Sequence, residues 1–440
     1  MTTSSTTPDA INVLLIGSGG REHAIAHAIS RSSRLGTLHL TDQSNPGLQS
    51  LGTRVDIPVS RKEIYRLDQY CNHHNISLVI IGPEDPLAEG YTDALATETR
   101  FVFGPTQAGA RLESDKAWAK QFMRQMAIPA AEGRAFTDAE AAHEYVRTRM
   151  DGVVVKAAGL AKGKGVIVPS TVDEAHAAVD AVLVEKQFGN AGNICVIEEQ
   201  LKGPEVSVFA LTDGKTLAVL DVCQDHKRLL DNNMGPNTGG MGAFCPSPLV
   251  EAKLLAQIER DVLLPTVSGL RREGIVYRGV IYAGLMLTHA GPKVLEYNVR
   301  FGDPEAQVLL PRFTSDVLEM MYLTAQGRLE EADIQVRSGA ACTVVLASEN
   351  YPDSPRTGVT VNGLDDVTDE NVVVYHAGTK RDASGNIVTS GGRVLAITGL
   401  GDNLHTARDT AYNAAKKIHF DGMQMRSDIG ASVLTSNATR

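Results

Sequence analysis

The first part of the chain alternates short apolar runs with longer stretches whose apolar residues recur every three or four positions. Short apolar runs are typical of buried strands, and the longer period is typical of helices that bury one side. Elements that alternate in this way form a parallel, doubly wound sheet. We therefore expect a Rossmann-like N-terminal domain, with strands at 11–17, 37–40, 77–82 and 101–104 and helices at 21–32 and 61–74.

The pattern changes after a long helical stretch that begins near Thr106 and ends before Pro129. Beyond a small α+β module, two long β segments predict hairpins, which turn over Asp213-Gly214 and over 289–292. Three further apolar runs and a helix at 403–418 predict a mainly β domain at the C-terminus. We therefore divide the chain into an α/β region followed by three α+β or mainly β regions: 1–127, 128–199, 200–335 and 336–440.

Composition narrows the class of protein. A net charge of -10 argues against broad binding to nucleic acids or membrane surfaces, because both require basic patches. The five cysteines form no C-x-x-C pair, so they indicate a reducing compartment rather than disulfides or a zinc site. The polar N-terminus lacks the features of a signal peptide, and no apolar run is long enough to span a membrane. We expect a cytoplasmic protein without a nucleic-acid, membrane or obligatory protein partner.

Polar side chains alternate along the stretch VLEYNVRFGDPE, residues 294–305. In a strand, Glu296, Asn298 and Arg300 would share one face. The other face would carry Leu295, Tyr297, Val299 and Phe301. Carboxylate and amide oxygens suit a hard divalent cation, and the arginine would hold an anion bound to that cation. The alternative is a half-exposed sheet with ordinary polar residues outside.

The segment GSGGREHA, residues 17–24, follows a predicted strand and opens a helix. Glycines at this position bring backbone N–H groups close to a ligand, and a helix N-terminus favours a phosphate. The segment is similar to a dinucleotide-binding fingerprint, with Asp42 near the position of a ribose-binding acid, but Glu22 replaces the third glycine. Arg21 would instead clamp a phosphate monoester. A tight turn without a ligand is the other alternative.

The segment KAAGLAKGKGV, residues 156–166, contains glycines and lysines between two predicted strands. Its amides and ammonium groups are suited to fold over a polyphosphate, although its spacing does not match a Walker A loop. A solvated hairpin without a ligand is the alternative. Lys156 ends an apolar strand and needs a charged partner if it is buried, a role that a ligand phosphate would fill.

A third glycine-rich segment, residues 224–244, gathers acidic, basic, amide and hydroxyl groups. It is too long for a simple turn, and long loops in compact domains are usually functional or disordered. Met234, Met241 and Phe244 favour an ordered loop, which these side chains would anchor.

These segments together resemble the motif series of one family. The matching motifs are LLIGSGGREHA, GPEDPL, FGPT, KAAGLAKGKGV, VIEEQLKGPE, QDHKR, GPNTGGMGA, YAGLM, EYNVRFGDPE, HAGT and GGRVLAITGLG. They are similar to those of the phosphoribosylamine–glycine ligases, ATP-grasp enzymes of purine synthesis, and run in order from about residue 11 to the C-terminus. The resemblance implies a stand-alone enzyme that uses ATP and Mg²⁺ or Mn²⁺ to join glycine to 5-phosphoribosylamine. The reaction would pass through glycyl phosphate and yield glycinamide ribonucleotide, ADP and phosphate.

The resemblance also implies roles for individual residues and regions. Residues 128–199 would be the lid of the ATP-grasp unit and 200–335 its catalytic part. ATP would bind to Lys116, Lys156, Gly163, Gly165, Glu198, Glu199, Leu201 and Glu205. The metal ligands would be Glu296 and Asn298. Phosphoribosylamine and glycine would bind to Gly19, Gly20, Arg21, Glu22, Pro83, Glu84, Asn237, Thr238, Gly239 and Gly240. The catalytic residues would be Arg300, which would face the acyl phosphate, Asp225 and Lys227.

Two departures from the family pattern concern the lid. Family members commonly have Asp or Ser in place of Ala158 and a small neutral residue in place of Lys162. Two rival functions also share some features. A biotin carboxylase-like enzyme would use the same nucleotide site. Many such enzymes carry a further metal-binding acid on the strand that GVIYAGLML would form here, but this segment contains no acid. A nicotinamide-binding protein would leave the Lys156 hairpin and the Glu296 strand unexplained.

Overall fold

The structure of the protein is a computed structural model that describes residues 9–42, 44–149, 151–161 and 163–437. Lys162, one of the two departures from the family pattern, lies outside the described residues. No helix in these ranges is long and apolar enough to cross a membrane.

The N-terminal sheet has five parallel strands in the order β3-β2-β1-β4-β5. The strands are β1 (Ile11–Ile16), β2 (Leu35–Leu40), β3 (Thr53–Arg54), β4 (Leu78–Ile81) and β5 (Phe101–Phe103). Val13 and Leu15 of β1 pack in one apolar cluster with α1 (Gly20–Ile29), whereas Leu14 and Ile16 pack in a second with α3 (Ile64–His73). Both faces are therefore covered, as the doubly wound prediction requires; only β3 was not predicted.

The predicted helix from Thr106 is wrong in one respect, because it is divided into α6 (Gln107–Ser114) and α7 (Lys116–Gln125). Asp115 leaves the helical conformation, with φ -140° and ψ 86°, and its carboxylate accepts a hydrogen bond from the Trp118 amide at 2.9 Å. Aspartate is a preferred residue at this capping position. The break makes Lys116 the first residue of a new helix.

A four-stranded antiparallel sheet in the order β6-β9-β7-β8 follows. Its strands are β6 (Gly133–Phe136), β7 (Val153–Ala157), β8 (Val166–Ile167) and β9 (Cys195–Glu199). Two helices, α8 (Ala139–Arg147) and α9 (Val172–Leu183), pack with it around a separate apolar cluster. The predicted hairpin between Lys156 and Val166 is thus confirmed.

The central sheet has the order β11-β10-β16-β17. Its strands form the two predicted hairpins: β10 (Glu205–Thr212) with β11 (Leu217–Val219), and β16 (Gly279–Thr288) with β17 (Gly291–Asn298). The second turn is shorter than predicted, because Gly291 and Pro292 already pair with β16.

The strict alternation predicted for β17 is wrong at Leu295. The register of β17 on β16 shifts between the pairs Leu285–Val294 and Gly284–Glu296, so Leu295 forms a bulge and is partly exposed. A bulge adds one residue to one strand and redirects the side chains that follow. The buried residues of β17 are Pro292, Val294 and Tyr297, and Leu295 is not among them.

The C-terminal sheet has the order β12-β15-β18-β22-β19. Its strands are β12 (Gln224–Asp225), β15 (Gly242–Cys245), β18 (Ala340–Ala347), β19 (Val372–His376) and β22 (Arg393–Gly401), and α14 (Leu404–Ala415) packs on it. The predicted loop 224–244 therefore begins and ends in this sheet, and β13 (Arg228–Leu230) and β14 (Met234–Asn237) pair within it. Met241 and Phe244 are buried anchors, but Met234 is 62% exposed, against expectation.

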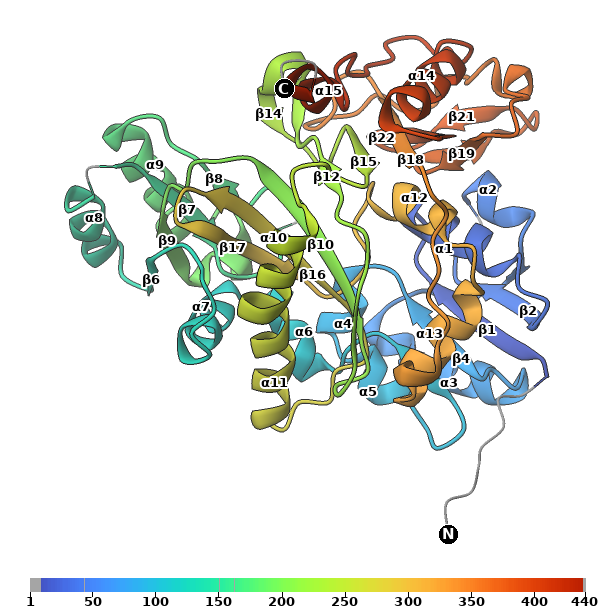
Figure 1. Ribbon diagram of the computed structural model, residues 1–440, viewed down its shortest axis with the longest axis horizontal. Coiled ribbons are helices and arrows are strands. Elements are labelled where there is room, and N and C mark those ends of the chain that lie inside the picture. Colours follow the sequence, from blue (N-terminus) through green and yellow to red (C-terminus); the bar gives the residue numbers. More distant parts are fainter. Residues whose placement is uncertain (1–8, 43, 150, 162, 438–440) are drawn as a thin grey trace.

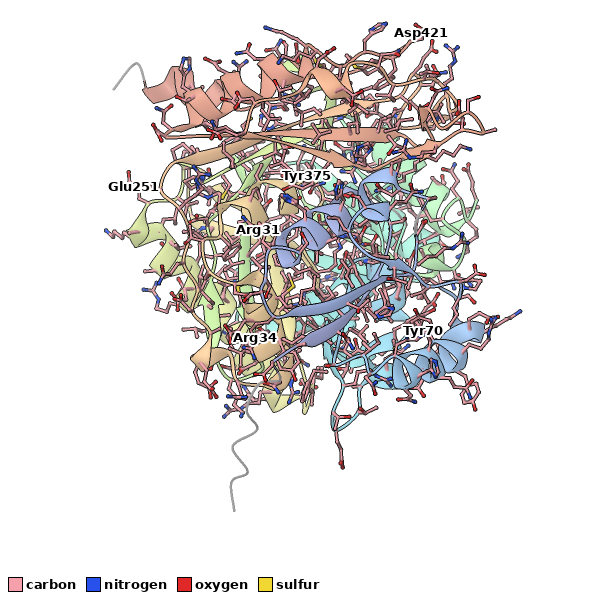
Figure 2. The ribbon with its side chains drawn as sticks, turned by 90° about the vertical axis from the view of Figure 1, so that its right-hand side faces the viewer. Arg31, Arg34, Tyr70, Glu251, Tyr375 and Asp421 are labelled. Carbon is pink, nitrogen blue, oxygen red and sulfur yellow. The ribbon has the colours of Figure 1, made fainter. Side chains whose placement is uncertain are left out.

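The central sheet lies between the β6–β9 module and the N-terminal sheet, while the C-terminal sheet lies over α1 and α2 (Pro46–Gln49) (Figure 1). Figure 2 shows Tyr375 of β19 at this contact. Tyr375 packs edge-on against His23 of α1, whose Nδ1 accepts a hydrogen bond from the His376 amide at 2.9 Å. The Asn45 side chain donates to the carbonyls of both Ser18 and His376, at 2.9 and 2.8 Å. The glycine turn before α1 is thereby fixed against the C-terminal sheet.

The cap of α7 gives a first testable prediction. Replacement Asp115→Ala removes the acceptor for the Trp118 amide and should weaken the first turn of α7 by about 1 kcal/mol. Amide hydrogen exchange in this turn should then be roughly fivefold faster. Asp115→Asn keeps a capping oxygen and should exchange almost as slowly as the unmodified protein; equal acceleration in both variants would show that the charge, not the cap, matters.

Candidate active site

Lys156, at the end of β7, is 5% exposed and is held by the protein itself. Its Nζ lies 2.7 Å from the Glu198 carboxylate and donates to the Leu295 carbonyl at 2.9 Å. The other oxygen of Glu198 lies 2.5 Å from Nζ of Lys120. Glu198 thus supplies the charged partner that the sequence analysis assigned to a ligand phosphate. Lys120 was missed, although it stands one helical turn after Lys116 and so lies on the same side of α7.

Lys116 lies at the start of α7 beside the β7–β8 hairpin. Its amide donates to the Ala158 carbonyl at 2.8 Å, and its Nζ donates to the Gly159 carbonyl at 3.3 Å. Burial lowers the pKa of Lys116, although Glu296 opposes this shift. Ala158 is itself buried and contacts Lys116 through its backbone, which any side chain would leave in place. Gly163 is exposed with φ +76°, and Gly165 is buried.

The remaining residues predicted to bind ATP lie at the end of β9 and the start of β10. Glu199 pairs with Lys293 at 2.8 Å, which lowers the pKa of Glu199 against the effect of burial. Leu201 is half-buried. Glu205 pairs with Lys227 at 2.9 Å. Glu199 and Glu205 are therefore each paired with a lysine of the protein.

Glu296 and Asn298 provide a carboxylate and an amide oxygen on β17. Burial would raise the pKa of Glu296, but Lys227, Lys156 and nearby cations lower it below its ordinary value, so the carboxylate is ionised. Within the described ranges, no group of three or more His, Cys, Asp or Glu side chains is arranged to hold a metal ion. The pair fits a hard cation that takes its other oxygen ligands from a bound molecule, as Mg²⁺ commonly does with phosphates.

Arg300 follows β17 and is surrounded by oxygen acceptors. Its guanidinium donates to Glu113 at 2.7 Å, to Asn298 at 3.1 Å and to Glu84 at 3.2 Å. Glu113, at the end of α6, also accepts a hydrogen bond from the Val299 amide at 2.8 Å. Burial raises the pKa of Glu113, and Arg300 opposes the shift. Glu113 could not be predicted from the sequence, because nothing local to α6 indicates a contact with the strand end.

Asp225 belongs to β12, the edge strand of the C-terminal sheet, and Lys227 follows it in the chain. The Asp225 side chain is 6% exposed, and Lys227, its ion-pair partner in the described structure, is 4.0 Å away. Burial raises the pKa of Asp225 to about 7, although Lys227 opposes this shift. Nearby, Glu305 accepts a hydrogen bond from the Tyr282 hydroxyl at 2.7 Å. Asp225 is therefore a weakly paired carboxylate that can change its charge near neutral pH.

Glu22 fills the space under the glycine turn. Its carboxylate accepts from the Gly19 amide at 2.6 Å and pairs with Arg21 at 2.6 Å. A Cβ on Gly82 would lie 2.1 Å from the Glu22 carboxylate, and a Cβ on Gly17 2.6 Å from its Cγ. The third glycine of the fingerprint is therefore replaced by two glycines elsewhere, which leave room for an acid. Arg21 is 7% exposed, and its guanidinium also approaches Glu84 at 3.8 Å.

A cavity of about 360 Å³ opens beside the glycine turn. It is lined by Ser18, Gly19, Gly20, Ser44, Asp303, Ala377, Gly378, Thr379, Ser390 and Arg393. Arg393 pairs with Asp303 at 3.4 Å and donates to the Gly239 carbonyl at 2.6 Å. Neither Arg393 nor Thr379 was predicted to belong to the site, although the matching motifs GGRVLAITGLG and HAGT contain them.

The loop from Asn237 to Gly240 contacts Lys227 on one side and Arg393, which lines this cavity, on the other. Thr238 donates to the Lys227 carbonyl at 2.8 Å, and the Gly239 amide donates to the Tyr351 hydroxyl at 2.9 Å. Gly240 has φ +114°, and a Cβ there would lie 2.6 Å from Pro304. Pro83 precedes Glu84 at the start of α4 (Glu84–Ala88). A larger cavity of about 660 Å³, beside Arg31 and Arg337, contains none of the predicted site residues.

Comparison with family models accounts for most of the chain. Residues 11–113 match the N domain of phosphoribosylglycinamide synthetase, residues 114–306 its ATP-grasp (A) domain and residues 341–432 its C domain.

Individual proteins agree with these matches. The chain is 43% identical to phosphoribosylamine–glycine ligase of Rhodopirellula baltica over 97% of this chain and 98% of that protein. It is 44% identical to the trifunctional purine biosynthetic protein adenosine-3 of Chironomus tentans over 95% of this chain, but it spans only 31% of that longer protein.

Solved structures separate the fold from the family. The crystal structure of phosphoribosylamine–glycine ligase from Thermotoga maritima is 32% identical, with a TM-score of 0.83 over 95% of this chain and all of that chain. The biotin carboxylase domain of a Hydrogenobacter thermophilus carboxylase has a TM-score of 0.72 over 95% of this chain and 92% of that chain, but it is only 15% identical and shows the fold alone. On these matches and on the arrangement of its site, the chain belongs to the phosphoribosylamine–glycine ligase family, with an ATP-grasp domain at its centre.

Proposed function

We propose that this protein joins glycine to 5-phosphoribosylamine at the expense of ATP, giving glycinamide ribonucleotide, ADP and phosphate. The observation that carries the proposal is the position of Arg300. It lies between the Glu296 carboxylate with its surrounding lysines and the glycine turn with its cavity. A nucleotide side and an amine side thus meet at one guanidinium, as a ligase with two chemical steps requires. Relatives named phosphoribosylamine–glycine ligase match the chain over nearly their whole length.

In the first step, a glycine carboxylate oxygen attacks the γ-phosphorus of ATP and ADP leaves, which forms glycyl phosphate. Lys116 and Lys156 would neutralise the phosphate oxygens, and the glycine-rich β7–β8 hairpin would cover these oxygens. Glu296 and Asn298 would hold Mg²⁺ or Mn²⁺, which would supply further neutralisation of the phosphate charge. The Glu198 to Leu201 segment would contact the adenine and Glu205 the ribose.

In the second step, the amine of phosphoribosylamine attacks the acyl carbon and phosphate leaves. Arg300 would face the acyl phosphate as negative charge leaves with it. The cavity beside Gly19 and Gly20 would hold the 5-phosphate, because Arg393 and the backbone N–H groups before α1 provide a cation and donors there. Arg21, which lies behind this turn and is already paired, would support the cavity rather than project into it.

Asp225 is the side chain best suited to hold the ammonium group of glycine. Its carboxylate is buried and weakly paired beside Lys227, so a cationic ligand would supply the missing opposite charge. Lys227 would face the carboxylate end of glycine, on the side of Glu296. Both residues would border the reacting centre, with the Asn237–Gly240 loop between them and the cavity.

We also propose functions for the regions of the chain. Residues 1–127 would form the phosphoribosylamine side, 128–199 the lid, 200–335 the catalytic part and 336–440 the C-terminal domain. A cytoplasmic location is supported by the cysteines, all five of which are buried and free. Independence from an obligatory protein partner stays a prediction, supported by relatives whose whole length the chain matches.

The rival functions are distinguished by their substrates. A carboxylase-like activity is disfavoured because the sequence of β16 contains no acidic residue to act as a further metal ligand. A nicotinamide-binding role is disfavoured because Glu22 occupies the third-glycine position of the fingerprint. The proposed function requires ADP formation that depends on both glycine and phosphoribosylamine, with glycinamide ribonucleotide as product. ADP formation with bicarbonate, or enhanced fluorescence on adding NADH, would favour the rivals.

The proposed metal ligand gives a second prediction. Glu296→Gln keeps the shape of the side chain but removes the charge that would hold the cation, so kcat should fall roughly a hundredfold or more while the fold stays intact. The magnesium concentration for half-maximal rate should rise. Glu251→Gln, on the exposed residue labelled in Figure 2, serves as the charge-matched control and should leave both values unchanged. Normal turnover of the Glu296 variant at limiting magnesium would exclude this residue as a ligand.

The raised pKa of Asp225 gives a third prediction. With a pKa of about 7 in the free enzyme, Asp225 is mostly protonated at pH 6 and mostly ionised at pH 8. If the ionised form binds glycine, KM for glycine should fall roughly tenfold between these pH values, while KM for ATP changes much less. Asp225→Asn should raise KM for glycine and remove this pH dependence. A pH-dependent KM for glycine that survives in this variant would assign the titration to another group.

A further inference from the structure

Five charged side chains of alternating sign connect the glycine turn with the reacting centre. Glu22 pairs with Arg21 at 2.6 Å, and Arg21 approaches Glu84 at 3.8 Å. Glu84 pairs with Arg300 at 3.2 Å, and Arg300 pairs with Glu113 at 2.7 Å. The five residues come from four separate segments, the starts of α1 and α4, the end of α6 and the chain after β17. The row therefore arises only from the tertiary fold.

Glu84 is the most exposed member of this row. Its side chain is 27% exposed, whereas those of the other four are between 3% and 15% exposed. It also stands between two arginines at unequal distances, because it is hydrogen bonded to Arg300 but only approaches Arg21. A small displacement would exchange one partner for the other without leaving a buried charge unpaired.

The donors of Arg300 are nearly all used in this arrangement. A guanidinium has five N–H groups. Those of Arg300 are directed to Glu84, Glu113, Asn298 and the Phe301 carbonyl, which leaves one for a ligand. Two carboxylates also offset its charge. Release of Glu84 would free the Nε–H group and leave Glu113 as the remaining carboxylate paired with Arg300, so that more of the guanidinium charge would act on an acyl phosphate.

We propose that Glu84 couples the amine-substrate site to the reacting centre: it restrains Arg300 while that site is empty and releases it when phosphoribosylamine binds. The inference rests on the proposed function. Gly20, next to Arg21, lines the cavity, and the amine and ribose hydroxyls of phosphoribosylamine are hydrogen-bond donors that would compete with Arg300 for Glu84. Glu84 is therefore a positioning residue, and its effect is to limit formation of glycyl phosphate when no amine is present.

The wasteful reaction that this contact suppresses has a simple balance. ATP and glycine give ADP and glycyl phosphate, and water then attacks the acyl carbon to return glycine and release phosphate. The sum is hydrolysis of ATP to ADP and phosphate, with glycine unchanged. Hydrolysis that depends on glycine but not on amine thus measures how far the contact fails.

The test uses the full-length enzyme and its Glu84→Gln variant. Glycine-dependent ADP formation without amine should rise roughly tenfold in the variant, because a neutral amide holds Arg300 less strongly. With phosphoribosylamine generated in the assay, more than one ADP should form for each glycinamide ribonucleotide. Asp85→Asn removes an equal charge from the exposed neighbouring position of α4 and should keep both values of the unmodified enzyme.

A second variant tests the contact in another way. Glu84→Asp keeps the charge but shortens the side chain, so it should weaken the contact with Arg300 and also raise amine-free ATP hydrolysis. It replaces Glu84→Gln in the test if that variant does not fold. Thermal melting of each variant identifies loss of fold.

Two results would overturn the inference. If the folded variants show unchanged amine-free hydrolysis and only a raised KM for phosphoribosylamine, Glu84 is a substrate ligand and nothing more. If amine-free hydrolysis falls, Glu84 holds Arg300 in its working position instead of restraining it. Failure of the proposed function is separate, because the unmodified enzyme would then form no glycinamide ribonucleotide.

Discussion

The carboxylate of Glu198, shared between Lys120 and Lys156, holds together the three elements that form the proposed nucleotide site. Helix α7 supplies one lysine, β7 the other, and β9 the acid between them. Removing one partner of such a buried pair typically costs about 3–5 kcal/mol, because the remaining charge is left without water or an opposite charge. The antiparallel module is therefore attached to α7 by electrostatics as well as by its chain connection, and Lys156 is directed toward Leu295 of β17.

Features that depend on neighbouring residues could be predicted from the sequence, whereas ion pairs between residues far apart in the chain could not. The doubly wound sheet and both hairpins follow from local periodicity, and Glu296 and Asn298 could be proposed as metal ligands because their alternation is itself a local pattern. Lys120 and Glu113 were missed because their partners are far away in the chain. The bulge at Leu295 could not be predicted either, since it arises from the register on β16 and not from the sequence of β17 alone.

The glycine turn shows how a departure from a motif changes its meaning. In the dinucleotide fingerprint the third glycine allows close packing of helix and strand. Here Gly17 and Gly82 make the room, and the Glu22 carboxylate occupies it to cap α1 and pair with Arg21. The acid at this position disfavours a dinucleotide pyrophosphate over the turn and at the same time begins the row of charges toward Arg300. The sequence shows that the turn departs from the fingerprint, and the three-dimensional contacts show that Glu22 caps α1 and pairs with Arg21.

The chain shares its fold with biotin carboxylases, so the fold and the choice of substrate can be considered separately. Likeness at 15% identity extends over 95% of the chain, so it includes the N- and C-terminal sheets as well as the nucleotide module. The architecture alone therefore does not select the second substrate. We expect this selection to depend on side chains at the edge of that architecture, such as Arg393 of β22 and Thr379 of β20 (Thr379–Arg381), which line one cavity together with Gly20. Because hydrogen bonds of Asn45 and His23 to His376 hold the two walls of this cavity together, its shape depends on contacts between the N-terminal domain and the C-terminal sheet.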